Sequence, residues 1–203
     1  MAAPAANLIC IAALLAIAVA AILLARAKAA TPIVYGAAFL ASLAALALAL
    51  RHLLAAPSDA AEIVLPLGLP WLGAHFRLDA LSALFLVVVN LGGAAASLYG
   101  IGYGRHESAP ARVLPFFAAF LAGMNLVVLA ADAFSFLLGW EFMSLVSWAL
   151  VLSHHRVAEN ARAALIYLVT ASFGTFCLLL LFGLLAGPAG GYGFDAMRAA
   201  TLS

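Results

Sequence analysis

One acidic side chain, Glu141, lies near the middle of a long apolar stretch that runs from Ala133 to Leu152. The stretch is about 20 residues long, which is enough for a helix to cross the ~30 Å hydrocarbon core of a membrane. An ionisable group at the centre of such a helix costs about 2.5–3.5 kcal/mol on insertion scales. Carboxylates at this depth commonly mark ion pathways, so the sequence favours a proton relay at Glu141. A buried, neutral structural role stays open as the alternative.

On a helical period of 3.6 residues, Glu141 shares a face with the hydroxyl of Ser144 and with large apolar side chains. We expect this face to point toward protein or a hydrated cavity, because lipid cannot solvate a carboxylate. No other Asp, Glu, Lys, Arg or His lies deep within an apolar stretch. Glu141 therefore either carries a proton at rest or pairs with a cation on polypeptide outside this chain.

Neutral polar residues also lie at mid-depth in the apolar stretches, namely Asn90, Asn125 and Ser172. Together with Ser144, they have two interpretations. They form hydrogen bonds between helices, worth about 0.6–2 kcal/mol each, or they hold waters on a proton path to Glu141.

Two adjacent histidines, His154 and His155, follow the span that carries Glu141. They are candidates for a titratable pair at the cytoplasmic mouth of a proton path, and a simple interfacial position is the alternative. A metal site is not expected there, because neighbours on a helix point ~100° apart.

The composition identifies the kind of protein that must position these groups. Hydrophobic residues make up 68% of the 203 residues and charged residues 8%, whereas soluble domains carry about 25% charge. The mean hydropathy of +1.20 also indicates a multi-spanning membrane protein. A net charge of +1 argues against nucleic-acid binding. Cys10 and Cys177 lie in separate apolar stretches without metal-ligand spacing, so we expect no metal or cofactor in this chain.

Windows of about 19 residues predict an all-α polytopic bundle of about six transmembrane helices. The predicted spans are 7–25, 32–52, 79–100, 113–131, 133–153 and 161–186, and we treat 1–203 as a single transmembrane domain. The long connector 55–78 contains two short apolar segments, 62–66 and 71–76, that can pair as a β-hairpin outside the bilayer.

Two further predictions concern the ends of the spans. Arg77 and Asp79 stand at the start of the third span, where Asp79 suits the N-cap position and the positive end of the helix dipole. After the glycine-rich break 187–193, residues 194–201 are expected to form a short interfacial turn.

The distribution of Lys and Arg predicts the orientation. The first, third and fifth connectors hold six of them: Arg26, Lys28, Arg105, Arg112, Arg156 and Arg162. The other side holds three: Arg51, Arg77 and Arg198. The positive-inside rule therefore places the odd connectors in the cytoplasm and both ends of the chain on the non-cytoplasmic side.

Three segments carry a family resemblance. Residues 76–85 (FRLDALSALF), 97–103 (SLYGIGY) and 139–148 (GWEFMSLVSW) resemble segments of the antiporter-like membrane subunits. These subunits occur in respiratory complex I, in multisubunit cation/proton antiporters and in membrane-bound hydrogenases. The MSL-x-SW form is most similar to hydrogenase-4 component B and formate hydrogenlyase subunit 3. Ala80 departs from the pattern, because many relatives carry Pro there.

The resemblance implies that Glu141 matches the family's essential glutamate, which pairs with a lysine on a later, broken helix. It also implies that this chain is the N-terminal part of a longer subunit built from inverted repeats. The implied partners are membrane lipids and the other membrane and peripheral subunits of a bacterial inner-membrane complex. Redox chemistry would belong to those subunits, so the chain is not expected to be catalytic alone.

We therefore predict a proton-translocating membrane subunit of a hydrogenase or NADH:quinone oxidoreductase-type complex. A cation/proton antiporter subunit and a non-conducting, truncated scaffold piece are the alternatives.

Overall fold

Six long helices dominate the computed structural model. The structure describes residues 3–24, 27, 29–55, 60–68, 70, 72–107, 109–154, 157–187 and 190–201, with the backbone alone at 154, 200 and 201. Within these ranges, six helices are long and apolar enough to cross a membrane. They are α1 (Ala3–Leu23), α2 (Ala30–Ala55), α3 (Ala80–Tyr103), α4 (Leu114–Leu129), α5 (Ala133–Val151) and α6 (Ala158–Ala186). The prediction of an all-α polytopic bundle is confirmed, and the helix ends differ from the predicted ones by a few residues.

Ala and Leu are the most frequent residues of these helices and have high helix propensity. Pro4, Pro32 and Pro115 lie in first turns, where no intrahelical donor is lost. Single 3₁₀ turns follow α3 (Gly104–His106), precede α4 (Pro110–Arg112) and follow α5 (Leu152–His154).

The connector between α2 and α3 forms the predicted hairpin. Strands β1 (Ala61–Leu65) and β2 (Ala74–Leu78) are antiparallel, with Ala61 opposite Leu78 and Leu65 opposite Ala74. The second strand begins and ends later than its predicted segment, because two positive-φ glycines, Gly68 and Gly73, lie between the strands. Trp71, which belongs to the predicted segment, lies outside the described residues.

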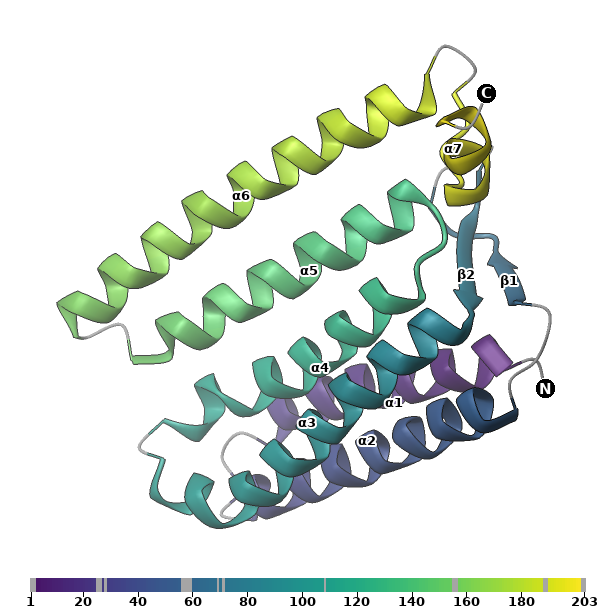
Figure 1. Ribbon diagram of the computed structural model, residues 1–203. Helices are drawn as coiled ribbons and strands as arrows, with labels where there is room; N and C mark the ends of the chain where they lie inside the picture. Colours follow the sequence, from purple (N-terminus) through teal and green to yellow (C-terminus); the bar gives the residue numbers. More distant parts are fainter. Residues whose placement is uncertain are drawn as a thin grey trace.

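Figure 1 shows the hairpin and the short helix α7 (Phe194–Thr201) at one end of the bundle. There α7 replaces the predicted interfacial turn. Along the bundle, α2 packs against α3, α1 against α4, α4 against α5, and α5 against α6. Small residues permit close approach at these interfaces. A Cβ atom at Gly100 of α3, for example, would lie 2.6 Å from the ring of Tyr35 of α2.

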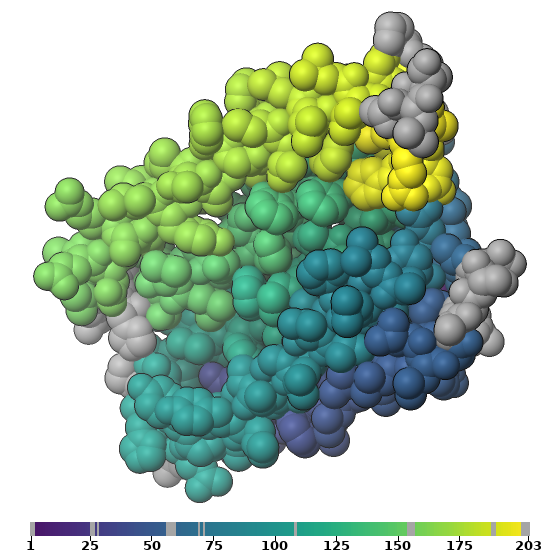
Figure 2. Space-filling model, in the orientation of Figure 1, coloured from purple at the N-terminus to yellow at the C-terminus, as the bar shows by residue number. Residues whose placement is uncertain are grey.

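The outermost long helix, α6, contributes little to the core. Its buried residues are Ala164 and Ala186, whereas its large apolar side chains are mostly exposed in this chain. Figure 2 shows α6 along one side of the molecule. In a membrane this surface must face lipid or other polypeptide.

A pair of buried amides joins α3 to α4. The Asn90 Nδ2 donates to Asn125 Oδ1 at 2.7 Å, and the Asn125 Nδ2 donates to Asn90 Oδ1 at 3.3 Å. Each amide nitrogen also donates to a carbonyl one turn earlier in its own helix, that of Leu86 or Leu121. This geometry matches the interhelical interpretation of the two residues.

Asp132, a fully buried carboxylate, joins the hairpin to the start of α5. Its Oδ1 accepts from the backbone N–H of Ser135 at 2.8 Å, which caps α5, and its Oδ2 accepts from the backbone N–H of His75 at 2.8 Å. The Ala131 N–H in turn donates to the His75 carbonyl at 2.9 Å. One side chain therefore satisfies donors from two elements, which fixes β2 against the end of α5.

The same junction holds the start of α7. The Phe194 N–H donates to the Ala131 carbonyl at 3.0 Å, and the Ala133 N–H donates to the Tyr192 carbonyl at 3.0 Å. Residues on both sides of Asp132 thus bind the segment that follows α6.

The imidazole of His75 bridges two acceptors in the hairpin. Its Nδ1 lies 2.7 Å from Glu62 Oε1, and its Nε2 lies 2.9 Å from the Leu72 carbonyl oxygen. Both ring nitrogens can donate at once only in the protonated form. The hydrogen bond to Glu62 raises the pKa of His75, while partial burial opposes the shift.

A pH-dependent contribution to stability follows. Because the pKa of His75 is raised on folding, the contribution is fully present below the unfolded value of about 6.5 and is lost as the pH rises through the folded value. We expect His75→Gln to lower the melting temperature of the purified protein at about pH 5.5, where His75 is charged, and to have little effect at about pH 9. His106→Gln, which alters a histidine of a 3₁₀ turn, is the control. An equal loss for His75→Gln at both pH values would contradict a charge-dependent contact.

The amide pair predicts a non-additive mutation cycle. Asn90→Leu or Asn125→Leu alone leaves the partner amide buried with a lost bond, at a cost of about 1–3 kcal/mol in the free energy of unfolding. The double Leu variant leaves no orphaned side-chain amide and should cost less than the sum of the single changes. Denaturation in detergent measures all three variants, and strictly additive losses would show that the pairing contributes nothing.

Candidate functional site

Glu141 lies in the middle of α5 and is half-buried. On one flank Ser144 is buried, whereas on the other flank Leu138 and Leu145 are 58% and 49% exposed. The carboxylate therefore stands at the boundary between the packed and the open surface of α5. The orientation of the carboxylate toward protein or a hydrated cavity stays a prediction.

Among the residues that the structure describes, none forms a hydrogen bond or an ion pair with the Glu141 carboxylate. The open surface beside Leu138 and Leu145 is adjacent to it, so additional polypeptide has room to reach the carboxylate from that side. The sequence left two alternatives, a protonated resting state or a cation outside this chain, and both stay open.

Close packing sets the register between α4 and α5, the helix that carries Glu141. A Cβ atom at Gly123 of α4 would lie 3.1 Å from the Cα of Met143, and one at Gly139 of α5 would lie 3.4 Å from the backbone nitrogen of Val127. The antiparallel helices thus place residue 123 opposite 143 and residue 127 opposite 139. Asn125 is therefore level with Glu141, and its amide is bonded to Asn90 on α3.

The other candidate path residues lie in different surroundings. Ser144 is buried one turn from Glu141, whereas Ser172 is exposed on α6. Asn90 and Asn125 are bonded to each other, as described above. The side chain of His154 and the whole of His155 lie outside the described residues. Participation of any of these residues in a proton path stays a prediction.

The predicted cap of α3 is present. The Asp79 carboxylate accepts from the Ser82 N–H at 2.8 Å, while the Ser82 hydroxyl accepts from the Asp79 N–H at 2.9 Å, which completes a capping box. Arg77 lies beside this cap, with its Nε 3.7 Å from Asp79 Oδ2.

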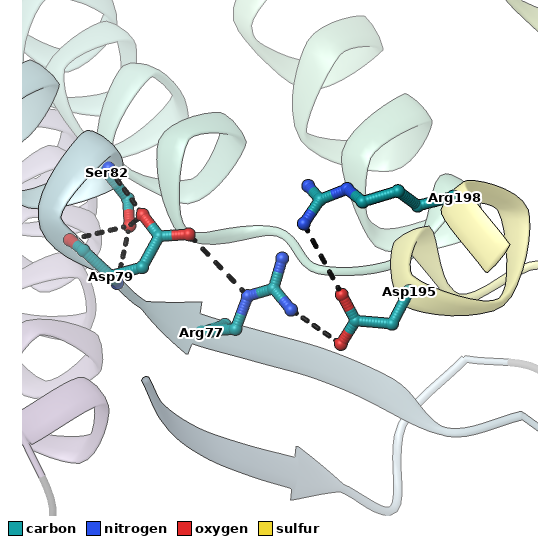
Figure 3. Close-up of polar contacts among 5 residues, drawn as sticks. All are labelled: Arg77, Asp79, Ser82, Asp195 and Arg198. Carbon is teal, nitrogen blue, oxygen red and sulfur yellow. Dashed lines mark hydrogen bonds and ion pairs between the residues drawn. The ribbon is translucent and has the colours of Figure 1, made fainter. Parts of the chain in front are cut away.

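Arg77 also reaches the far end of the chain. Its Nη1 donates to Asp195 Oδ2 of α7 at 2.6 Å, and Arg198 Nη1 lies 3.9 Å from Asp195 Oδ1 (Figure 3). The hydrogen bond from Arg77 holds the pKa of Asp195 below its ordinary value. Sequence analysis missed this cluster, because the two partners are separated by 118 positions and no local pattern connects them.

Comparisons with known proteins agree with the sequence resemblance. Residues 130–202 match the family model described as NADH:quinone oxidoreductase/Mrp antiporter, TM. The chain is 35% identical over 134 residues to the protein Rv0083 of Mycobacterium tuberculosis, an alignment that covers 64% of this chain and 20% of that protein. It is 32% identical over 129 residues to hydrogenase-4 component B of Escherichia coli, covering 63% and 19% respectively.

A solved structure shows the same fold. The chain superposes on a subunit of the Mrp complex from Dietzia sp. DQ12-45-1b with a TM-score of 0.74 and 25% identity, covering 94% of this chain and 20% of that one. The chain thus spans about a fifth of the length of the relatives that it matches. Over these regions the chain is similar to the antiporter-like membrane subunits of NADH:quinone oxidoreductases, Mrp antiporters and hydrogenases, and the fold is that of a multi-pass membrane protein.

Proposed function

We propose that this chain is the N-terminal part of a proton-translocating membrane subunit in a hydrogenase or NADH:quinone oxidoreductase-type complex. The observation that carries the proposal is the position of Glu141. It is half-buried at the middle of a spanning helix, beside an open apolar surface and without a described partner. An ionisable group at this depth is costly and is rarely retained there without a role.

In the proposed mechanism, Glu141 accepts and releases a proton as a neighbouring cation approaches or withdraws. An approaching cation favours the ionised carboxylate and drives the proton off, and its withdrawal in a low-dielectric site favours proton uptake. No cation among the described residues pairs with Glu141. The cation would therefore come from polypeptide that covers the open side of α5. Ser144, buried one turn along α5 from Glu141, would support the water that delivers the proton.

The fold constrains the other partners. Because the chain spans about a fifth of its relatives' length, further helices of the same subunit would cover α5 and α6. Other membrane and peripheral subunits would carry the redox chemistry and its cofactors. The proposed location is a bacterial inner membrane. The hairpin, α7 and both ends of the chain would lie on the non-cytoplasmic side, as the Lys and Arg distribution predicts.

A cation/proton antiporter subunit is the second candidate, and it is favoured by the superposition on the Mrp complex. The two functions share the proton relay at Glu141 and differ in what is coupled to it. Sodium- or potassium-dependent proton movement without a redox substrate would favour the antiporter. Proton movement that requires electron transfer would favour the first function, and neither would occur in a non-conducting scaffold.

The central prediction concerns Glu141→Gln in the full-length protein. Gln keeps the size of the side chain but cannot release a proton, so we expect proton translocation to be abolished while assembly of the complex is retained. A pH-sensitive dye in proteoliposomes measures translocation, and native gel electrophoresis measures assembly.

Glu159→Gln is the matched control, because Glu159 is an exposed carboxylate at the start of α6. It should translocate protons at the wild-type rate. Undiminished translocation by Glu141→Gln would reject the relay, and loss of assembly in that variant would assign Glu141 the structural role instead.

A further inference from the structure

A cavity of about 570 Å³ opens between the hairpin end of the bundle and α7. It is bounded by the start of α3, the end of α4, the first half of α5 and α7. This volume falls within the range of about 300–1,000 Å³ that is typical of ligand sites. Glu141 is not among its lining residues, so the cavity is separate from the proposed relay.

The lining divides into a charged rim and an apolar wall. The rim carries Arg77, Asp79 and Arg198, at the level where α3 begins and α4 ends. The wall is made of large apolar and aromatic residues, most of them on the helices further from the hairpin than the rim. They are Leu81, Phe85, Val127, Val128, Phe136, Trp140 and Phe194. An amphipathic ligand with its polar group at the membrane boundary would match this division.

The rim presents charges of both signs. Figure 3 shows the Arg77 guanidinium between Asp79 and Asp195, with Arg198 near the second carboxylate oxygen of Asp195. Two cations and two carboxylates leave this cluster neutral overall. The Nη2 of Arg77 has no partner among the described residues. Asp195 is not itself a lining residue, but its largely exposed carboxylate pairs with Arg77 and Arg198 of the rim. Such a rim complements a headgroup that carries both a phosphate and an ammonium.

Trp140 provides a second, independent observation. It lines the cavity, and its buried indole Nε1 has no acceptor among the described residues. Buried tryptophan N–H groups usually have a partner. The side chain of a helical residue covers the turn on its N-terminal side, and Trp140 stacks on Phe136 with ring centroids 6.0 Å apart. The indole is therefore displaced toward the rim. Because the Nε1 atom is itself buried, the ester carbonyl of a lipid accepts its hydrogen bond only when the ring turns toward the cavity.

We propose that this cavity binds a zwitterionic aminophospholipid, a glycerolipid with a phosphoethanolamine headgroup. The phosphate contacts Arg198 and the Nη2 of Arg77, and the ammonium contacts the carboxylates of Asp195 and Asp79. A glycerol ester accepts from Trp140, and an acyl chain follows Phe85 and Phe136. The lipid thereby joins α3, α5 and α7 at the hairpin end.

Native mass spectrometry of the delipidated, full-length protein tests the proposal by titration with defined lipids. We expect phosphatidylethanolamine to bind more tightly than phosphatidylglycerol, whose headgroup lacks the ammonium, and than diacylglycerol, which lacks the phosphate. Inorganic phosphate together with ethanolamine should not compete, because neither occupies the apolar wall. Equal binding of all three lipids would indicate unspecific lipid contact and would overturn the site, as would preference for phosphatidylglycerol.

Two matched pairs of variants locate the binding. Arg198→Gln should weaken phosphatidylethanolamine binding roughly fivefold through a lost charged contact, whereas Arg162→Gln, an exposed arginine on α6, should not. Phe85→Ala should weaken binding of the same lipid, whereas Phe173→Ala on α6 should not; these side chains are 52% and 68% exposed, so neither change opens the core. Unchanged binding in both Arg198→Gln and Phe85→Ala would overturn the proposal.

Discussion

The hydrocarbon core offers no hydrogen bonds to a polar group, and this constraint governs how the chain is built. The Asn90 and Asn125 amides meet it by bonding to each other and to carbonyls of their own helices. Glu141 lies level with this pair on the adjacent helix and has no described partner of its own. Two polar sites at one depth therefore differ, because one is internally satisfied and the other depends on a further contact.

At the hairpin end of the bundle, the buried carboxylate of Asp132 has the same requirement for hydrogen-bond partners. It is fully buried and satisfied by two backbone donors, one from α5 and one from β2. The segments beside it also bond the start of α7. The helix that carries Glu141 is consequently anchored at its hairpin end by two other elements, β2 and the start of α7. Its opposite end leads into α6, of which only Ala164 and Ala186 are buried among the described residues.

The surfaces that remain open lie where additional components are proposed. In the proposed longer subunit, further helices would cover the apolar face of α6 and the exposed flank of α5. The cavity at α7 has a charged rim and would receive a lipid headgroup. These surfaces differ in chemistry, since protein helices bury apolar area while a lipid headgroup requires ionic partners.

The sequence by itself determined the six spans, the hairpin, the cap at Asp79, and the position of Glu141 in the middle of its helix. The length of an apolar stretch, the turn residues and the capping residues are all local features, so the sequence alone predicts the elements that they define. The family resemblance added that Glu141 corresponds to a functional glutamate. Only the tertiary structure decided that Asn90 bonds to Asn125, that Asp132 accepts from His75, and that Arg77 reaches Asp195. It also decided which flank of Glu141 is open, since that depends on the packing of α4 and α6 around α5 and not on the periodicity of α5 alone.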